Sequence, residues 1–346
     1  MLNFCTLFDS NYLSRGLTMY KSLVAHCPSF NLYIICLDDK LYKYLSENKL
    51  SNIKAISLSD IEVYYPELIG AKNNRSYVEY IFTLSPVIPL YLLKRFPEIE
   101  LITSMDADIF FFSDPSVLLC DSDSFSIAIT PHRFKSGLKF LEKYGMYNVS
   151  FQTFKNNKTG LECLNKWKEE CINWCYDKFE SNKFADQKYL DEWIKTYPDV
   201  KEYKKGSGVA PWNVRNKDIG LDEKGNILFR NEPLIYYHFH GLRNLSDKLL
   251  SIGLNEYLVL GRKKIIRFIY HKYIKELSDQ SALINNKNGN KIKRGMNLKM
   301  GKLIFYLFLA DLYRYENDKL THIINFNFFR YINSSLKSAI NLFRFS

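Results

Sequence analysis

The chain has 346 residues, of which 47% are hydrophobic and 16% aromatic, and its formal net charge is +11. This length and apolar content are typical of one large or two smaller folded domains, not of a disordered chain. No apolar run reaches the roughly 18 residues of a membrane-spanning helix, and the opening MLNFCTLFDS lacks the pattern of a signal peptide. Seven cysteines without a C-x-x-C pair favour reduced thiols in a cytoplasmic protein over a zinc site.

Positive charge is concentrated in the last quarter of the chain. Residues 261–346 contain 17 Lys and Arg against 5 Asp and Glu, whereas the preceding residues are nearly neutral. The sequence therefore predicts a boundary near residue 250. We expect an α/β domain over 1–250 and a basic, aromatic-rich helical region over 251–346.

Predicted strands and helices alternate along the first region. Strands are expected at 2–7, 31–37, 52–58 and 99–105, with helices at 13–25 and at 74–95, the latter interrupted near Pro86 and Pro89. Farther along, the patterns indicate strands at 125–130 and 147–154, helices at 158–180 and 186–196, a loop at 206–212 and a strand ending at 236–241. This alternation predicts an α/β fold with a mixed, mostly parallel sheet flanked by helices. Ligands of such sheets lie beyond the carboxyl ends of the strands.

Asp106 and Asp108 follow the predicted strand at 99–105 and precede the apolar run Ile-Phe-Phe-Phe. Two carboxylates at the end of a buried strand are costly unless a cation pairs with them. A divalent metal that carries a diphosphate meets that need, and hard oxygen ligands favour Mg²⁺ or Mn²⁺.

The D-x-D pattern by itself is a weak signal, because about one is expected by chance in a chain of this length. Asp121 and Asp123 form a second such pair in a polar stretch, and we interpret that pair as a solvated loop. Capping of the following turn is the alternative for Asp106 and Asp108, but their apolar flanks favour the metal site.

His238 and His240 close an apolar strand before Gly241. Alternate residues of a strand lie on the same face, so either imidazole could complete the ligand shell of the metal. The alternative is a core histidine whose hydrogen bonds are satisfied within the protein.

Asp186 and Gln187 open a predicted helix. An aspartate at this position is commonly an N-cap. The functional alternative is a carboxylate and an amide presented to a reacting sugar, and composition does not choose between the two.

Polar and aromatic residues also lie at several predicted strand ends and loops. They are His132 and Arg133 after one strand, Asn148 at the start of the next, and Trp212 and Asn213 after the glycine-containing loop. Each is compatible with ordinary loop chemistry, and together they are the groups expected around a sugar, whose apolar face stacks on aromatic rings.

The order of these motifs resembles the GT-A glycosyltransferases. The segments FDSNY, MDADIFFFSDP, Asn148, Asp186-Gln187 and His238-Phe-x-Gly are similar to family 8, which includes bacterial lipopolysaccharide galactosyltransferases and glycogenin. The segments ITPHRF, YNV, DQKYLD and APWN carry a tighter resemblance to a bacterial group of uncharacterised nucleotide-diphospho-sugar transferases. The resemblance covers about residues 1–245.

The resemblance implies roles for individual residues. The first turn would bind the nucleotide base and ribose through Thr6, Phe8, Asp9, Asn11 and Tyr12. Asp106, Asp108 and His238, the last in preference to His240, would bind Mn²⁺ or Mg²⁺, with Asp106 also near the nucleotide. Asp186 and Gln187 would lie near the anomeric carbon. The Lys-Pro-Trp that follows the histidine in the family is absent here, which leaves Arg243 as the expected partner of the diphosphate.

We therefore expect a metal-dependent glycosyltransferase with a GT-A fold. It would move a sugar from a nucleotide-diphosphate donor, with a UDP-sugar favoured, to a saccharide or lipid-linked acceptor in bacterial surface polysaccharide or lipopolysaccharide synthesis, with retention of configuration. One alternative is a sugar-nucleotide nucleotidyltransferase, although the first turn lacks the glycines and cations typical of that class. The other is a non-catalytic sugar- or lipid-binding module.

The basic tail mixes aromatic and aliphatic residues with Lys and Arg at helical spacing. This pattern is compatible with attachment to an anionic membrane surface, which predicts a cytoplasmic protein peripheral to the inner face of the bacterial cell membrane. The alternative is a set of helices that pack on the main domain with a solvated basic face. We expect no nucleic-acid partner, because no recognisable nucleic-acid module accompanies the charge.

Overall fold

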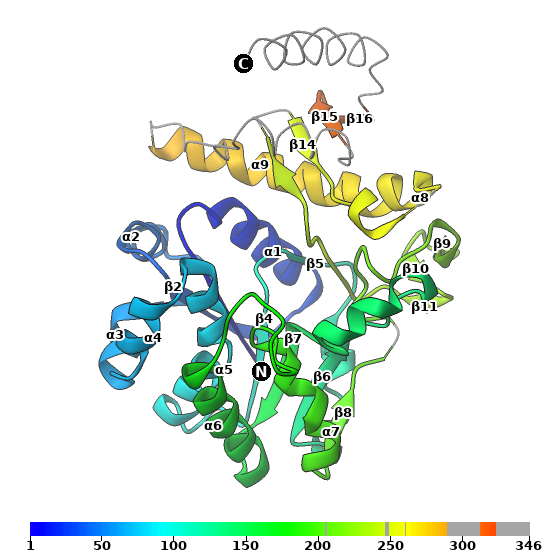
Figure 1. Ribbon diagram of the computed structural model, residues 1–346. Helices are drawn as coiled ribbons and strands as arrows, with labels where there is room; N and C mark the ends of the chain where they lie inside the picture. Colours follow the sequence, from blue (N-terminus) through cyan, green and yellow to red (C-terminus); the bar gives the residue numbers. More distant parts are fainter. Residues whose placement is uncertain (205, 246–248, 260, 289–311, 323–346) are drawn as a thin grey trace, which may run out of the picture. The chain divides into compact units, whose positions relative to one another are not determined.

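The computed structural model describes residues 1–204, 206–245, 249–259, 261–288 and 312–322 (Figure 1). The chain divides into two compact units. The first consists of Met1–His240 and Leu254–Ile292, and the second of Gly241–Gly253 and Lys293–Ser346. The functional boundary expected near residue 250 stays a prediction.

A seven-stranded sheet with the order β3-β2-β1-β4-β7-β6-β8 forms the centre of the first unit. Its strands are β1 (Leu2–Phe8), β2 (Phe30–Cys36), β3 (Ile53–Ser57), β4 (Leu101–Met105), β6 (Ile127–Pro131), β7 (Tyr147–Lys155) and β8 (Val200–Glu202). Neighbouring strands are parallel except where β7 meets β4 and β6. The predicted mixed, mostly parallel sheet is confirmed.

Alternation along the strands divides the apolar core between the two faces of this sheet. Phe4 and Leu32 belong to one buried cluster together with residues of α1 (Leu13–His26) and α2 (Asp39–Asn48). Cys5 and Tyr33, one position along each strand, belong to a second cluster with α3 (Leu58–Tyr64), α4 (Leu68–Asn74), α5 (Tyr77–Arg95) and α6 (Lys158–Asn173). Helices therefore cover both faces of the sheet.

Three predicted helices differ from expectation. α5 runs without interruption through Pro86 and Pro89, begins with a capping box between Ser76 and Glu79, and buries most of its second half. α6 ends at Asn173, because Trp174 is extended and the Arg75 guanidinium donates to the free carbonyl oxygens of Cys171 and Ile172. The predicted helix at 186–196 is a 3-10 helix over Gln187–Glu192 followed by α7 (Trp193–Thr196).

A short antiparallel ribbon joins two distant parts of the chain. It consists of β5 (Ile109–Phe111) and β12 (Tyr236–His238), with His238 opposite Ile109. The backbone N–H of Phe239 donates to the carbonyl of Asp108 at 2.9 Å, which extends the pairing by one step. Nearby, β9 (Ile219–Leu221), β10 (Ile227–Phe229) and β11 (Glu232–Pro233) form a three-stranded sheet.

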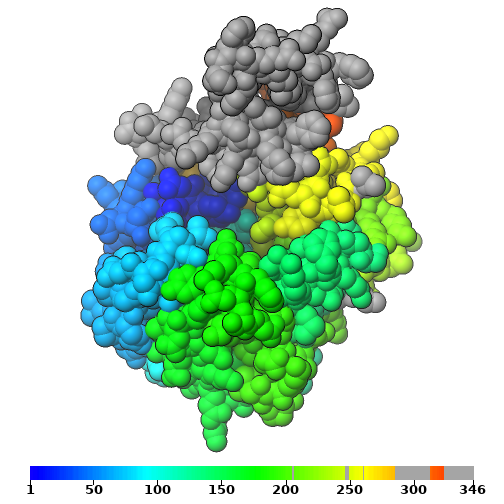
Figure 2. All heavy atoms as spheres, viewed as in Figure 1, coloured from blue at the N-terminus to red at the C-terminus, as the bar shows by residue number. Residues whose placement is uncertain are grey.

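The helical segment after residue 262 begins with α8 (Lys263–Ile265), continues through a π-helical turn (Ile266–Tyr270) and ends with α9 (His271–Asn288). Its buried face carries Ile269, Tyr270, Tyr273, Ile274 and Leu277. α9 packs on α1, and Figure 2 shows the yellow surface of this region adjoining the dark-blue N-terminal segment. Among the described residues, no helix is long and apolar enough to cross a membrane.

The second unit contains four antiparallel strands, β13 (Arg243–Asn244), β14 (Leu249–Ser251), β15 (Leu312–Glu316) and β16 (Lys319–His322). Helix was expected over 312–322, and that expectation was wrong. Asn317 and Asp318 both have φ near +50°, the conformation of a tight hairpin turn that asparagine and aspartate tolerate. The tail segments at 289–311 and 323–346, also expected to be helical, lie outside the described residues.

Candidate functional site

Asp106, Asp108 and His238 converge at the carboxyl end of β4. Asp106 and Asp108 occupy the turn between β4 and β5, and His238 ends β12, which pairs with β5. The His238 Nε2 atom lies 3.1 Å from Asp108 Oδ1 and 3.6 Å from Asp106 Oδ2. One ligand atom from each residue falls within 4.8 Å of the others. The ribbon between two distant segments therefore assembles three metal-ligating groups.

The three groups strongly perturb one another. Desolvation and the charge of Asp108 raise the pKa of Asp106, although His238 opposes the rise. Desolvation disfavours the Asp108 carboxylate, but the charge and hydrogen bond of His238, together with Arg15, hold its pKa well below the usual range. Desolvation also disfavours the His238 imidazolium, yet the Asp108 and Asp106 carboxylates raise its pKa. The two carboxylates thus favour a positive charge between them, and a divalent cation would supply one.

This donor set fits a divalent metal. Two carboxylates and one imidazole converge from positions fixed by the sheet, and such oxygen-rich sets suit Mg²⁺ or Mn²⁺. His238 lies close to the carboxylates, whereas its neighbour in the motif, His240, is exposed and lies beside Trp212 and Tyr257. The geometry favours His238 as the third ligand, as the resemblance implies.

The first turn lies at the carboxyl end of β1. Asp9 shapes it, because its Oδ1 accepts hydrogen bonds from the backbone N–H groups of Asn11 (3.0 Å) and Tyr12 (3.1 Å). Tyr12 then reaches the triad and donates from its hydroxyl to Asp108 Oδ2 at 3.2 Å. Thr6 and Phe8 are buried in β1, and the Thr6 hydroxyl lacks a hydrogen-bond partner in the described structure.

Asp186 is buried at the wall of a cavity that Asp106 and His238 also line. The Ser85 hydroxyl of α5 donates to Asp186 Oδ2 at 2.6 Å, and Trp167 Nε1 donates to the Asp186 carbonyl at 2.9 Å. Burial raises the pKa of Asp186 to about 6, against the opposing effect of the Ser85 hydrogen bond. Its side chain accepts no N-cap hydrogen bond of the kind that sequence reasoning left open.

The cavity has a volume of about 480 Å³ and an aromatic wall. Phe134, Tyr144, Phe184, Trp212 and Tyr257 line it, as do the predicted site residues His132, Asn148, Asp186, Gln187, His238 and His240. The His132 ring stacks on Phe134 with 4.6 Å between centroids, and Trp212 lies edge-on to His132 and His238. Burial lowers the pKa of His132 to about 3, so its ring is neutral at physiological pH.

Two buried polar atoms of this wall, Trp212 Nε1 and His132 Nδ1, have no hydrogen-bond partner in the described part of the protein. Unpaired buried donors and acceptors are costly, so the wall is suited to a ligand with hydroxyl or carbonyl groups. Apolar rings beside such atoms are the chemistry expected around a sugar.

The other predicted site residues mainly bind the backbone. The Asn148 side chain donates to the Thr130 carbonyl (3.2 Å), and its Oδ1 accepts from the backbone N–H of Ser150 (3.1 Å). Arg133 donates to the Ser207 and Tyr203 carbonyls. Asn213 donates to the His132 carbonyl (2.9 Å) and the Gly208 carbonyl (2.8 Å), and Gln187 donates to the Tyr144 carbonyl (3.0 Å). Arg243 belongs to the second unit, and its role as diphosphate partner stays a prediction.

Sequence reasoning missed Ser85, Arg15, Tyr144, Phe184 and Tyr257. Ser85 and Arg15 lie inside helices, where nothing local distinguishes them from ordinary helix residues. Only the packing of α5 and α1 on the two faces of the sheet brings them to Asp186 and Asp108. Tyr144 and Tyr257 end short 3-10 helices and Phe184 lies in a loop, and no sequence period fixes the course of such segments.

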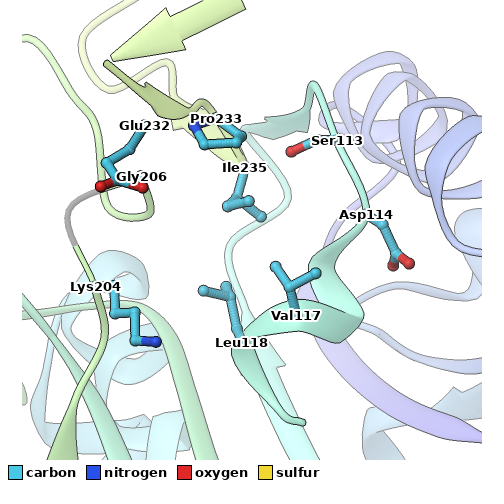
Figure 3. A pocket seen from close by; sticks show the side chains of 9 residues that line it. All are labelled: Ser113, Asp114, Val117, Leu118, Lys204, Gly206, Glu232, Pro233 and Ile235. Carbon is cyan, nitrogen blue, oxygen red and sulfur yellow. The ribbon is translucent and has the colours of Figure 1, made fainter. Parts of the chain in front are cut away.

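A second cavity of about 790 Å³ lies away from these residues (Figure 3). Val117, Leu118 and Ile235 form its apolar floor, and Asp114, Lys204 and Glu232 stand around it. None of the predicted site residues lines it. We therefore assign the chemistry to the smaller cavity beside the triad.

The sheet and its flanking helices have the fold known as GT-A, after the GT-A glycosyltransferases. Among solved structures, the galactosyltransferase LgtC in complex with donor and acceptor sugar analogs aligns with a TM-score of 0.50 and 14% sequence identity, over 80% of this chain and 96% of LgtC. A likeness at this identity shows the fold, and it confirms the predicted GT-A fold.

Particular relatives come from Bacillus subtilis (strain 168). The chain is 29% identical to the uncharacterised protein YfnD over 279 aligned residues. The alignment covers 80% of this chain and 88% of YfnD. It is 28% identical over 251 residues to the uncharacterised protein YfnF, with 70% and 82% covered. No protein-family model matches the chain.

Proposed function

We propose that the protein is a metal-dependent glycosyltransferase that uses a nucleotide-diphospho-sugar donor. The observation that carries the proposal is the convergence of Asp106, Asp108 and His238 beside Asp186 at one cavity of a GT-A fold. A metal next to a buried carboxylate would favour cleavage of a sugar–phosphate bond, because negative charge develops on the departing diphosphate.

In this proposal the triad binds the metal, and the first turn binds the base and ribose of the nucleotide. Asp106, Asp108 and His238 would hold Mn²⁺ or Mg²⁺, which supplies positive charge for the diphosphate when bound. Asp9 and Tyr12 would shape the site of the base and ribose, and Arg243 would add a cation for the diphosphate. UDP is the favoured nucleotide.

Asp186 and Gln187 are the groups proposed to lie near the anomeric carbon. Ser85 and burial hold the Asp186 carboxylate in a fixed orientation at the cavity wall, where it would stabilise positive charge on the reacting sugar. The Gln187 amide holds the Tyr144 carbonyl and so keeps an aromatic residue of the wall in place. We propose that configuration is retained.

The acceptor is proposed to be a saccharide or a lipid-linked saccharide of a bacterial surface polysaccharide or lipopolysaccharide. The aromatic wall with its unpaired Trp212 Nε1 and His132 Nδ1 atoms supports a sugar at this position. Asn148, Arg133 and Asn213 would support the wall through their backbone hydrogen bonds.

Calorimetric titration of UDP, GDP and their sugars tests the proposal. We expect at least one nucleotide to bind more tightly with Mn²⁺ than without it. If added metal tightens the binding of none of them, the proposal is wrong. Sugar or lipid binding without metal-dependent nucleotide binding would instead indicate a non-catalytic module.

We further propose that the exposed face of α8 and α9 attaches the enzyme to an anionic membrane surface. Lys263, Arg267, Lys272 and Lys275 are exposed on this segment, and each basic residue near an anionic surface contributes about 1 kcal/mol. This face would place the enzyme at the inner side of the cell membrane, close to a lipid-linked acceptor.

Cosedimentation with vesicles containing an anionic lipid tests the attachment. The double variant Arg267→Glu with Lys272→Glu should release the protein from the vesicles. The matched control, Lys40→Glu with Lys139→Glu, makes the same change of charge at exposed positions elsewhere and should leave binding intact. Equal loss in both variants would mean that net charge, not this face, governs binding.

A further inference from the structure

The first turn and the metal triad are joined by Arg15 and Tyr12. Arg15 Nη1 donates to the Tyr12 hydroxyl oxygen at 2.7 Å, and the same hydroxyl donates to Asp108 Oδ2 at 3.2 Å. The guanidinium also lies 4.6 Å from the centroid of the Tyr12 ring, a cation–π distance. A cation, a phenol and a carboxylate therefore form one connected series from α1 to the triad.

Both oxygens of Asp108 are engaged by this arrangement. Oδ2 accepts from Tyr12, and Oδ1 faces His238 Nε2 at 3.1 Å. The backbone of Asp108 is held as well, because its carbonyl accepts from the Phe239 N–H at 2.9 Å. The carboxylate cannot rotate without breaking its bond to Tyr12, and this bond thus sets which oxygen is presented to the metal position.

The other end of the series is fixed by the first turn. The Tyr12 N–H donates to the Asp9 carbonyl (3.0 Å) and to Asp9 Oδ1 (3.1 Å), while Asp9 Oδ2 accepts from the Tyr77 hydroxyl (3.2 Å). Any rearrangement of the turn moves the backbone of Tyr12 and with it the phenol that holds Asp108. The turn and the carboxylate are mechanically linked.

α9 closes the space behind this series. The Tyr273 ring is fully buried and stacks on Phe239 with 3.7 Å between centroids and 9° between planes. Tyr273 is also close enough to Arg15 and Asp108 for their charges to act on it. Water is therefore kept from this side, and hydrogen bonds to a charged group are stronger where water is excluded.

We propose that Arg15 and Tyr12 are positioning residues that orient Asp108 for the metal and couple metal binding to nucleotide binding in the first turn. The proposal rests on the proposed function for the nucleotide, but its metal half does not need a nucleotide. Mutation of a residue that is hydrogen-bonded to a metal ligand typically lowers metal affinity by about 10- to 100-fold. Coupling between two binding sites is reciprocal, so the metal should tighten nucleotide binding through the same contacts.

The variant Tyr12→Phe tests the proposal, because it removes only the hydroxyl and keeps the ring. Mn²⁺ affinity without nucleotide is measured by electron paramagnetic resonance of the free ion, and UDP affinity by calorimetry with and without Mn²⁺. We expect Mn²⁺ to bind about tenfold more weakly to the variant. The factor by which Mn²⁺ tightens UDP binding, taken from the affinities measured with and without the metal, should shrink in the variant.

Arg15 is tested by a pair of substitutions. Arg15→Gln removes the cation behind the Tyr12 hydroxyl and should weaken Mn²⁺ binding, as Tyr12→Phe does. Arg15→Lys keeps the charge and should recover part of the affinity. A purely structural role for Arg15 would lower the melting temperature in both variants without this order in Mn²⁺ affinity.

Tyr20→Phe is the matched control. Tyr20 is a buried tyrosine of the same helix, and its hydroxyl donates to the Ser51 carbonyl at 2.9 Å, away from the triad. This variant should bind Mn²⁺ as the wild type does. Unchanged Mn²⁺ affinity in Tyr12→Phe, or an equal loss of affinity in both tyrosine variants, overturns the inference. In that case the proposed function still holds if Mn²⁺ tightens UDP binding by the wild type. Absence of Mn²⁺ binding by the wild type, together with UDP binding that Mn²⁺ does not tighten, overturns both.

Discussion

The hydroxyl of Ser85 donates a 2.6 Å hydrogen bond to the buried carboxylate of Asp186. The two residues come from α5 and from the turn that precedes Gln187–Glu192, and they meet at the wall of the candidate active-site cavity. Burial raises the pKa of Asp186 to about 6, and this hydrogen bond opposes the rise. At neutral pH the chain therefore holds a negative charge where its burial costs stability.

Asp186→Asn should increase the free energy of unfolding above about pH 6 and have little effect at pH 4. The pKa of Asp186 is higher in the folded protein, about 6, than its ordinary value of 3.8, so the stability that the protonated group contributes is lost as pH rises between these values. Two pKa units correspond to a gain of up to about 3 kcal/mol at pH 8. Urea unfolding from pH 4 to 8 measures it, and a difference that does not depend on pH would contradict this assignment.

Ser85→Ala provides the companion test. Without the hydroxyl, the ionised form of Asp186 loses a hydrogen bond, and the pKa of Asp186 in the folded protein should rise by about one unit. The pH range over which stability is lost should therefore extend upward, while its lower end stays near the ordinary pKa. In the double variant Ser85→Ala with Asp186→Asn, the free energy of unfolding should not show the pH dependence attributed to Asp186. If that pH dependence persists in the double variant, it comes from another titrating group.

Asp106→Asn should abolish detectable Mn²⁺ binding, with a loss larger than the about 100-fold typical of outer-shell partners. The chain offers its own control in the second D-x-D pair. Asp123 is fully exposed and contacts only Lys155 among the ion pairs of the described residues, so Asp123→Asn should bind Mn²⁺ as the wild type does. Equal affinities in the two variants would show that the triad is not the metal site.

Gly16→Ala should disturb the first turn. A Cβ atom at Gly16 would lie 2.3 Å from the Phe8 ring, so the ring must move at the end of β1, and both stability and UDP affinity should fall. Gly70→Ala in α4 is the control, because a Cβ there meets nothing within 4 Å. Since alanine favours helix over glycine by about 1 kcal/mol, Gly70→Ala should stabilise the protein. Thermal unfolding and UDP titration distinguish the two results.

Tyr273→Ala should lower the free energy of unfolding by about 3–5 kcal/mol, as for other large aromatic residues removed from a core. The control is Leu283→Ala on the same helix, where the side chain is 51% exposed and the change should stay within about 0.5 kcal/mol. Chemical denaturation measures both. A small effect at Tyr273 would mean that α9 contributes little to the core of the first unit.

The sequence was sufficient for the sheet and for the pair Asp106 and Asp108 because both depend on local patterns. The preference for His238 over His240 came from the family resemblance alone. Apolar strands alternating with amphipathic helices specify an α/β sheet, and Asp106 and Asp108 interrupt such a strand. Helix ends were less predictable. α6 ends where Arg75, which is distant in sequence, donates hydrogen bonds to the carbonyl oxygens of Cys171 and Ile172. Ser85 and Arg15 could not be found, because tertiary packing alone brings them to Asp186 and Asp108.

Polar loop residues were ambiguous for a different reason. Asn213 and His132 both suggested sugar contacts, yet the Asn213 amide is taken by the His132 and Gly208 carbonyls, whereas His132 Nδ1 stays unpaired at the cavity. Nothing in composition distinguishes an amide that braces a loop from one that faces a ligand.

The pairing of β5 with β12 places His238 opposite Ile109, about 130 residues later in the chain than Asp108. A ribosome must therefore have released nearly the whole GT-A unit before all three ligands exist together. Partly synthesised chains carry the aspartate pair without its histidine and would bind a divalent ion weakly. If the triad binds a metal as proposed, tight capture of the ion would report that the chain has been synthesised past His238 and that β5 and β12 have paired. The metal would then serve as a probe for following maturation in the cell.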